Sequence, residues 1–182
     1  MYPTQWQQGI EEARDEKDWF FSSHPQSPLP AAERKRFKGL AYYPIDPAYR
    51  FELPLHEHER KGTIETGDTA GQTRALWRWG EFRFAIDGLD CTLQAYKSDT
   101  GEERLFVPFR DGTSGKESYG AGRYLDLEPA RHRTSQGTWI VDFNEAYNPW
   151  CAYSGDYACP FVPPENWLRV PVRAGEKSHE HG

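Results

Sequence analysis

The chain has 182 residues, of which 28 are acidic and 22 basic, and its formal net charge is −6. A chain of this length favours a single domain, and its acidic balance repels phosphate at long range, which argues against a nucleic-acid partner. No apolar run approaches the ~20 residues that cross a bilayer, and the first residues do not resemble a secretion signal, so we expect a soluble, cytoplasmic protein with no membrane partner.

The first predicted element is a helix over about residues 4–22. Thr4 suits the N-cap position, and Trp6, Ile10 and Ala13 follow at near-helical spacing with charged residues between them. This pattern is typical of an amphipathic helix. Three prolines in "SHPQSPLP" end it, and "AAERKRF" at 31–37 favours a short second helix.

Between about residues 37 and 175 the hydrophobic period changes to two, which indicates strands. The run "GEFRFAIDGLDCTLQAY" alternates on both sides of Asp87-Gly88, a dipeptide that suits the primed turn of a hairpin. Further strands are predicted at "YRFEL", "TRALWRW", "RLFVPF", "GRYLDL", "TWIVDF" and "NWLRVPV", which makes roughly eight to ten in all.

Short turns separate these runs, so the strands should pair antiparallel and curl. We therefore predict a mainly β fold, either an antiparallel β-barrel or a strongly curved sandwich, with the N-terminal helix covering one opening or face. Residues 1–177 should form one domain with its β core at about 37–175. The polar residues 178–182 should form a disordered tail.

The glycine-rich stretch 111–125 contains Gly115-Lys116 but is not a phosphate loop. A phosphate loop needs a glycine at position 110, where this chain has Arg110. It also needs Ser or Thr at position 117, where this chain has Glu117. Two interpretations stay open. Either the stretch is a hairpin connection, or its glycines leave room for a ligand beside Arg123. In the second case the rigid, planar guanidinium of Arg123 would bind an anion.

Histidines and cysteines give no metal site in the sequence. His56 and His58 would share one side of a strand but lack a third ligand, and their charged neighbours indicate a solvated edge or loop. Three cysteines without a secretion signal should be reduced thiols, with Cys91 a buried strand residue. Cys151 and Cys159 pack in a turn-rich region or supply a nucleophile, although no histidine stands in a partner motif.

Residues 142–166 concentrate polar side chains with little hydrophobic periodicity. If "TWIVDF" is a strand, Asp142 and Asn144 share one face, and a buried Asp142 requires partners, for which Arg123 and Tyr147 are the candidates. These polar residues either cap turns and satisfy the backbone of a long loop, or surround a barrel mouth that holds a small polar molecule.

The chain resembles a known family in these same regions. The ordered set "ARDEKDWFF", "SPLP", "FKGLAYYPIDPAYRF", "LFVPFRDGTSGKESYGAGRYLDL" and "DFNEAYNPWCAYSGDYACPFVPPENWLRVPVRAGEK", over about residues 13–177, is similar to domain-of-unknown-function family 1684 (DUF1684) of bacteria and archaea. Trp150 stands where the family has tyrosine, and Phe161-Val162 is bulkier. The resemblance implies membership but no reaction, substrate or cofactor. Its signature coincides with Arg123, Asp142, Asn144, Tyr147, Asn148, Cys151, Cys159, Glu165 and Asn166.

Two functions are compatible with this pattern. In the first, loops 111–125 and 142–166 form a mouth that binds a small polar or anionic molecule, with Asp142 or Glu165 as general base if a reaction follows. The binding residues would be Arg123, Tyr124, Asn144, Tyr147, Asn148, Tyr153 and Asn166. In the second, a plugged barrel serves as a non-catalytic interaction domain anchored by Trp77, Trp79 or Trp150. No cofactor and no oligomeric state follow from the sequence.

Overall fold

Helix α1 (Gln5–Ser23) opens the fold of a computed structural model that describes residues 3–179. Its start is set by a capping box: the Thr4 side chain accepts a hydrogen bond from the Gln7 amide at 3.2 Å, and the Gln7 side chain accepts one from the Thr4 amide at 2.8 Å. Ile10 and Phe21 are its buried side chains. The predicted N-terminal helix is confirmed, and the short second helix is α2 (Ala31–Arg34).

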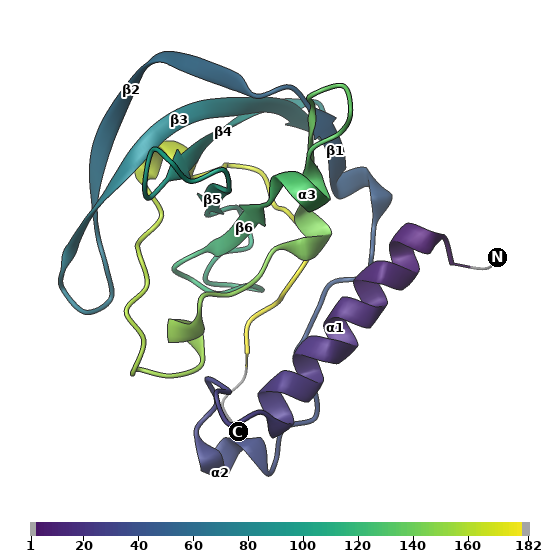
Figure 1. The fold of residues 1–182 in the computed structure, drawn as a ribbon. Coiled ribbons are helices and arrows are strands. Elements are labelled where there is room, and N and C mark those ends of the chain that lie inside the picture. The colour runs from purple at the N-terminus through teal and green to yellow at the C-terminus, as the bar shows by residue number, and fades with distance from the viewer. Residues whose placement is uncertain (1–2, 180–182) are drawn as a thin grey trace.

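The strands of residues 3–179 form two antiparallel sheets. One sheet has five strands in the order β2-β3-β4-β5-β6, and the other pairs β1 with β7. In Figure 1 the larger sheet curves around one end of the molecule, and α1 runs past the other end beside the C-terminal segment. The strands are β1 (Arg50–Leu53), β2 (His56–Gly67), β3 (Thr73–Ile86), β4 (Leu89–Lys97), β5 (Leu105–Phe109), β6 (Arg123–Leu127) and β7 (Trp139–Asp142).

Short helical turns join these elements. They are α3 (Pro129–His132), η1 (Pro47–Tyr49), η2 (Phe143–Glu145), η3 (Trp150–Ala152) and η4 (Pro164–Asn166).

The β3–β4 hairpin has the predicted turn. Asp87 and Gly88 both have positive φ, 51° and 76°, which is the conformation of a two-residue primed turn. The pairing of β3 with β4 continues from Ile86↔Leu89 to Trp77↔Lys97, with one irregularity at Gly80. The sequence predicts two separate strands, "TRALWRW" and "GEFRFAI". In the structure these residues form the single strand β3.

The sheets do not close into a barrel, so this part of the prediction is wrong. The count of seven strands in residues 3–179 is also below the predicted eight to ten. The stretch "NWLRVPV" forms no strand because its backbone binds other groups: the Val170 carbonyl accepts from the Gly112 amide at 2.9 Å, and the Val172 carbonyl accepts from the Arg123 side chain at 2.8 Å. Residues 167–172 of this predicted strand are irregular chain instead.

Both sheets contribute to one packed interior. Phe82 and Leu93 from the larger sheet and Val141 from β7 are all 0% exposed. The ring of Phe143 lies 5.2 Å from that of Phe109 and 5.6 Å from that of Phe84, in tilted or edge-on arrangements. Each such side chain contributes roughly 1.5–3 kcal/mol through burial. The space inside the curved sheet is therefore filled by side chains.

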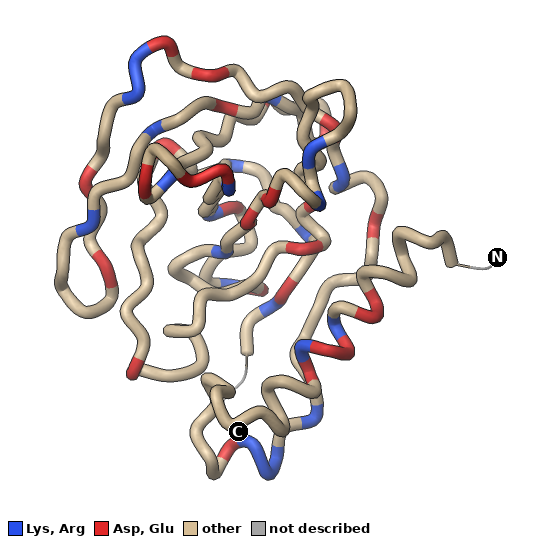
Figure 2. The backbone as a smooth tube through the Cα atoms, viewed as in Figure 1, with Lys and Arg blue, Asp and Glu red and all other residues tan. Residues whose placement is uncertain are grey.

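Charged residues of both signs are spread along the chain, and in α1 they lie in its middle part, residues 11–18 (Figure 2). Within residues 3–179 no helix is both long and apolar enough to cross a membrane. Of the predicted disordered tail 178–182, Ser178 donates its amide to the Glu117 carbonyl at 3.0 Å and His179 packs on the Tyr153 ring at 5.2 Å. Residues 180–182 lie outside the described part of the chain.

Gly122, just before β6, tests how tightly the core is packed around the chain. Its φ is +106°, and an added Cβ would lie 2.6 Å from the Phe109 carbonyl oxygen and 2.7 Å from Val162. Gly122→Ala should lower the free energy of unfolding in urea by at least about 2 kcal/mol. The control is Gly9→Ala in α1, where no atom lies within 4 Å and helix propensity should add about 0.5–1 kcal/mol. Equal effects from the two changes would contradict this packing.

Candidate functional site

The two segments predicted at one mouth, 111–125 and 142–166, do lie against each other. Tyr124 and Tyr147 exchange backbone hydrogen bonds of 2.9 and 3.1 Å. The Tyr124 hydroxyl donates to the Pro160 carbonyl, and the Tyr119 hydroxyl lies 3.7 Å from the Cys151 sulfur. The segments thus meet through backbone and phenol contacts, and Tyr124 uses its hydroxyl to hold the chain.

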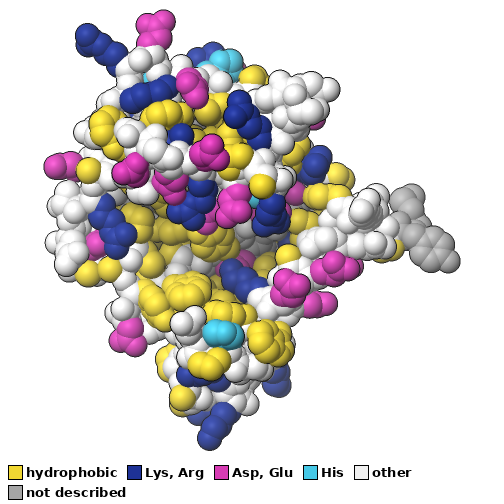
Figure 3. Space-filling model, in the orientation of Figure 1, with side chains coloured by type: hydrophobic (Ala, Val, Ile, Leu, Met, Phe, Trp, Pro, Cys, Tyr) yellow, Lys and Arg dark blue, Asp and Glu magenta, His cyan; other side chains and the backbone are white. Residues whose placement is uncertain are grey.

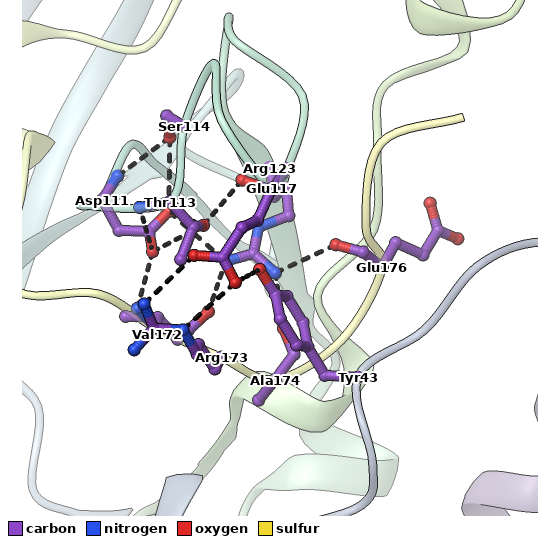
Figure 4. Close-up of polar contacts among 11 residues, drawn as sticks. Tyr43, Asp111, Thr113, Ser114, Glu117, Arg123, Val172, Arg173, Ala174 and Glu176 are labelled. Atoms are coloured by element: carbon purple, nitrogen blue, oxygen red, sulfur yellow. Dashed lines mark hydrogen bonds and ion pairs between the residues drawn. The ribbon is translucent and has the colours of Figure 1, made fainter. Parts of the chain in front are cut away.

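Arg123, the predicted anion anchor, is 0% exposed and bound to the chain itself. Its guanidinium donates to the Asp111 carboxylate at 3.3 Å and to the carbonyls of Val172 at 2.8 Å, Glu176 at 3.1 Å and Ala174. Figure 4 shows this arrangement, which we call the Arg123 clamp. Of its nitrogens only Nε has no partner among the described residues. Arg123 therefore holds the C-terminal segment against β6 and is not available as the anchor of a ligand.

Asp142 is also buried, but its partners differ from those predicted. One carboxylate oxygen accepts from the Trp6 indole N–H at 2.8 Å, and the other accepts from the amide and the side chain of Asn144 at 2.9 and 2.8 Å. The predicted pairing with Arg123 or Tyr147 is wrong. Burial raises the pKa of Asp142 above its ordinary value. Asp142 caps η2 and fastens the start of α1 to β7.

Glu165 and Asn166 lie beside β4. Glu165 accepts hydrogen bonds from Tyr96 at 2.5 Å and from Arg78 at 3.0 Å. Asn166 is 0% exposed, and its side chain donates to carbonyls of β4 and β5 at 2.9 and 2.8 Å. Glu165 and Asp142, the two predicted bases, share no hydrogen-bond partner in the described chain. The Asn166 side chain thus provides hydrogen bonds to backbone carbonyls of two neighbouring strands and links them.

Asn148 and Tyr153 are buried and meet at Glu176. One carboxylate oxygen of Glu176 accepts from the Asn148 amide at 2.7 Å and from the Tyr153 hydroxyl at 2.8 Å. The other oxygen is bound by Lys17 of α1. Glu176 is 1% exposed, so these three donors compensate a carboxylate withdrawn from water. This cluster ties α1 to the C-terminal segment.

A cleft of about 290 Å³ lies between α1 and the β core. We call it the α1 cleft. In Figure 3 the surface is hollowed there, with hydrophobic side chains on the core side and a basic side chain on the helix side. Of the nine predicted site residues, Asn144 and Tyr147 line it and the other seven do not. The remaining lining residues come from α1 (Ile10, Ala13, Arg14, Lys17), from β6, α3 and the residues around them (Leu125, Asp126, Glu128, Arg131, His132), and from Tyr42, Glu145, Ala146 and Glu176.

Most charged side chains of the α1 cleft are paired with one another. Lys17 binds Glu176, and the guanidinium of Arg131 lies 3.2 Å from Glu145. The Tyr147 hydroxyl donates to Asp126. The two ion pairs balance the charges of their partners, and Asp126 also lies 3.8 Å from Arg104, which stands outside the cleft.

His132 contributes a fixed hydrogen-bond donor to this cleft. Its Nδ1 accepts from the Glu128 amide at 2.9 Å, so the ring proton resides on Nε2, which donates to Glu145 at 2.8 Å. In this arrangement the ring is an uncharged donor, and Glu145 is held by His132 and Arg131 together.

Arg14 is the exception among the basic residues of the cleft. It forms no ion pair within 4.0 Å in the described chain, and its guanidinium donates to the carbonyls of Tyr43 at 3.1 Å and Asn144 at 3.4 Å. Its Cζ lies 4.3 Å from the centre of the Tyr42 ring. Arg14 Nε and the Tyr42 hydroxyl are buried and have no hydrogen-bond partner within residues 3–179. Burial lowers the pKa of Arg14, but a guanidinium keeps its charge at neutral pH.

The family model for "Protein of unknown function (DUF1684)" matches residues 35–177. The chain belongs to the DUF1684 family. Among solved structures, an uncharacterised protein of Haloarcula marismortui, determined in solution by NMR, is similar to this chain: it is 42% identical, each chain is covered to 94%, and the TM-score is 0.72. No curated protein matches the chain.

Thirteen of the fifteen residues that line the cleft of this DUF1684 protein were not predicted, among them Arg14, Lys17, Tyr42, His132, Glu145 and Glu176. One signal was available for two of them. Arg14 and Lys17 follow Ile10 by four and seven residues, so both lie on the helix face that carries buried Ile10 and Phe21. A basic residue on that face needs an acceptor or an anion. No comparable local signal marks the others, because tertiary contacts bring them together.

The Arg123 clamp can be tested against an exposed ion pair in the same cluster. Arg123→Met leaves the buried Asp111 without its cation and should lower the free energy of unfolding by about 3–5 kcal/mol. Arg173→Met removes a pair with Glu117 in which the arginine side chain is 55% exposed, and should cost no more than about 1 kcal/mol. Urea denaturation of both variants measures the difference. Comparable losses would show that the buried position has no special role.

Proposed function

We propose that this DUF1684 protein binds a small carboxylate-bearing molecule in the α1 cleft, with Arg14 as the group that recognises the anion. The observation that carries the proposal is the lack of an ion-pair partner for Arg14 in the described chain, beside a cavity of about 290 Å³. The anionic ligand expected from the sequence is retained, but its anchor moves from Arg123 to Arg14.

The orientation of the Arg14 guanidinium supports this role. Two of its five N–H donors are used by the carbonyls of Tyr43 and Asn144, and the group stacks on Tyr42. Three donors (5 − 2) are left, and a planar guanidinium fixed in this way matches the fork geometry of a carboxylate. An ammonium group would not offer this match.

Tyr42 supports the same site. Its hydroxyl has no partner among the described residues, and leaving a buried polar group unpaired costs about 1–3 kcal/mol. Because this atom and Arg14 Nε are both covered, a ligand oxygen would reach them only after a side-chain rotation. Binding would then recover hydrogen bonds that the free protein lacks.

The size of the cleft favours a small ligand. Its volume of about 290 Å³ lies at the low end of the roughly 300–1,000 Å³ typical of small-molecule sites. Apolar side chains of Ile10, Ala13 and Leu125 form part of its wall. A short carboxylate with a small apolar body fits this combination.

The proposal is for binding without an assigned reaction. Asp142 and Glu165, the bases expected from the sequence, hold donors of the chain itself and do not line the cleft. The cytoplasmic location is retained as part of the proposal, and the three free cysteines are consistent with a reducing compartment.

The test compares short carboxylates with their neutral amides in ¹⁵N-resolved NMR titrations. Acetate and benzoate should shift resonances of α1 and α3 residues in a saturable way, whereas acetamide and benzamide should not. Arg14→Gln should weaken carboxylate binding by about tenfold or more, because charge-assisted hydrogen bonds are worth about 1.5–3 kcal/mol.

The matched control is Arg131→Gln, which removes a paired arginine from the same cleft. It should change affinity much less than Arg14→Gln does. Tyr42→Phe, which removes the unpaired hydroxyl, should weaken binding while leaving the stability of the free protein equal or higher. Equal affinity of wild type and Arg14→Gln, or no saturable response to either carboxylate, would reject the proposal.

A second candidate function is an interaction module, favoured by the packed interior of the curved sheet. The anchors expected for it, Trp77, Trp79 and Trp150, are only partly exposed, whereas Trp19 on α1 is 61% exposed. Trp19 borders an apolar groove of about 620 Å³ that shares Ala13 and Lys17 with the α1 cleft. An exposed tryptophan beside an apolar groove is a common anchor of protein interfaces.

Self-association tests this candidate with the protein alone. If the groove docks a second copy, sedimentation velocity should show dimers at high concentration that Trp19→Ser abolishes. Leu89→Ser, at another exposed apolar residue (58%), should leave the association unchanged. A wild-type protein that stays monomeric, or equal effects of both variants, would count against self-docking at Trp19.

A further inference from the structure

The segment 148–163 holds two free thiols side by side, away from the α1 cleft. The backbone N–H of Cys151 donates to the sulfur of Cys159 at 3.3 Å, which places the two residues in direct contact. The Tyr119 hydroxyl lies 3.7 Å from the Cys151 sulfur. Neither cysteine is in a disulfide.

Cys159 is held in place from the opposite side by the β2–β3 turn. Its backbone N–H donates to the Thr69 hydroxyl at 3.0 Å, and its carbonyl accepts from the Thr69 amide at 3.1 Å. Next to it, the Arg74 guanidinium donates to the Ala158 carbonyl at 3.0 Å. The sulfur of Cys159 therefore has a fixed position with the Cys151 amide as a donor, and the Arg74 guanidinium nearby is itself paired with Asp68 at 3.0 Å.

This environment favours the thiolate of Cys159. The neighbouring Cys151 thiol, then the hydrogen bond from the Cys151 amide and the charge of Arg74, lower the pKa of Cys159 below its ordinary value. The neighbouring Cys159 thiol, together with burial, raises the pKa of Cys151. The pair thus divides into one sulfur suited to attack and one that keeps its proton.

Access differs between the two sulfurs. Cys159 is 8% exposed, whereas Cys151 is half-buried. A reagent that reaches Cys159 must be small. The third cysteine, Cys91, is buried in β4, where burial raises its pKa and its thiol donates to the Leu89 carbonyl at 3.5 Å. Cys91 is therefore an internal control of the same residue type without a second thiol.

We propose that Cys159 and Cys151 form a dithiol that is oxidised by small hydroperoxides, with Cys159 as the attacking sulfur and Cys151 as the resolving one. The Cys159 thiolate attacks one peroxide oxygen, the O–O bond breaks, and the departing oxygen takes a proton to leave as water or an alcohol. Cys159 is now a sulfenic acid.

The second step forms a disulfide within the segment. The Cys151 sulfur attacks the sulfur of the sulfenic acid, an S–S bond forms, and the S–O bond breaks. The hydroxide that leaves takes the proton of the Cys151 thiol and becomes water. In sum the dithiol loses two protons and two electrons, and one peroxide is reduced to two molecules of water, or to water and an alcohol.

The test measures thiols and intact mass of the full chain after brief exposure to hydrogen peroxide. Wild type should fall from three reactive thiols to one under denaturing conditions, with a mass loss of about 2 Da that dithiothreitol reverses. Peptide mapping should find the disulfide between residues 151 and 159 and a free Cys91. This measurement needs no variant, so it holds even if a substitution impairs folding.

Two variants then assign the roles. Cys151→Ser should accumulate a sulfenic acid on Cys159 that dimedone traps. The Cys159→Ser variant should consume peroxide at least about tenfold more slowly than wild type. Its Cys151 should form no more dimedone adduct than Cys91 does. The Cys91→Ser variant should behave as wild type.

The outcomes separate cleanly. Retention of all three thiols in wild type, or oxidation of Cys91 at the same rate as the pair, would overturn the proposal. So would a Cys159→Ser variant whose Cys151 reacts as fast as the wild-type pair. Because the reaction takes place outside the α1 cleft, it can succeed or fail independently of carboxylate binding.

Discussion

The buried guanidinium of Arg123 is the constraint on which the arrangement of the other parts depends. A charge that is 0% exposed must find acceptors within the protein, and this one finds a carboxylate on the 111–118 loop and three carbonyls of the C-terminal segment. By binding these carbonyls, the Arg123 clamp fixes the backbone of residues 172–176 beside β6, and the Glu176 side chain starts from this fixed segment. Glu176 in turn binds Lys17 of α1, and both residues line the α1 cleft. The Arg123 clamp therefore helps to position α1 against the rest of the cleft.

Local rules were sufficient for the elements whose ends depend on neighbouring residues. The capping box at Thr4 and the positive φ angles at Asp87-Gly88 are properties of short stretches, and both agree with the sequence. Closure of the barrel is a different matter because it depends on partners far along the chain. Residues 166–172 alternate as a strand should, but their backbone groups are taken by residues 110, 112 and 123. Nothing in a seven-residue window reveals that competition.

The polar segment 142–166 shows why abundant specific side chains do not by themselves locate a site. Asp142, Asn144 and Asn166 spend their hydrogen bonds on turns and on strand carbonyls, which was one of the two interpretations left open. An irregular buried segment has many backbone groups to satisfy, and asparagine and aspartate do so at short range. The buried side-chain atoms without a partner among the described residues are Nε of Arg14, Arg34 and Arg123, the Tyr42 hydroxyl and Asn148 Oδ1, and of these only Asn148 Oδ1 belongs to this segment. A search for basic residues on the helix face that carries buried Ile10 and Phe21 would have found Arg14, whereas His132 and Glu145 become neighbours only through the fold.

The separation of Arg123 from its acceptors has a consequence for how the chain is made. The carbonyl of Glu176 lies 53 residues further along the chain than the guanidinium that binds it. On a ribosome, which adds roughly 5–20 residues each second, β6 is complete seconds before that acceptor has been joined to the chain. During this interval the arginine stays in water, because burying an uncompensated cation is unfavourable. The Arg123 clamp is therefore completed late in biosynthesis, after residue 147, which pairs with the edge of β6 through Tyr124, has already been added to the chain.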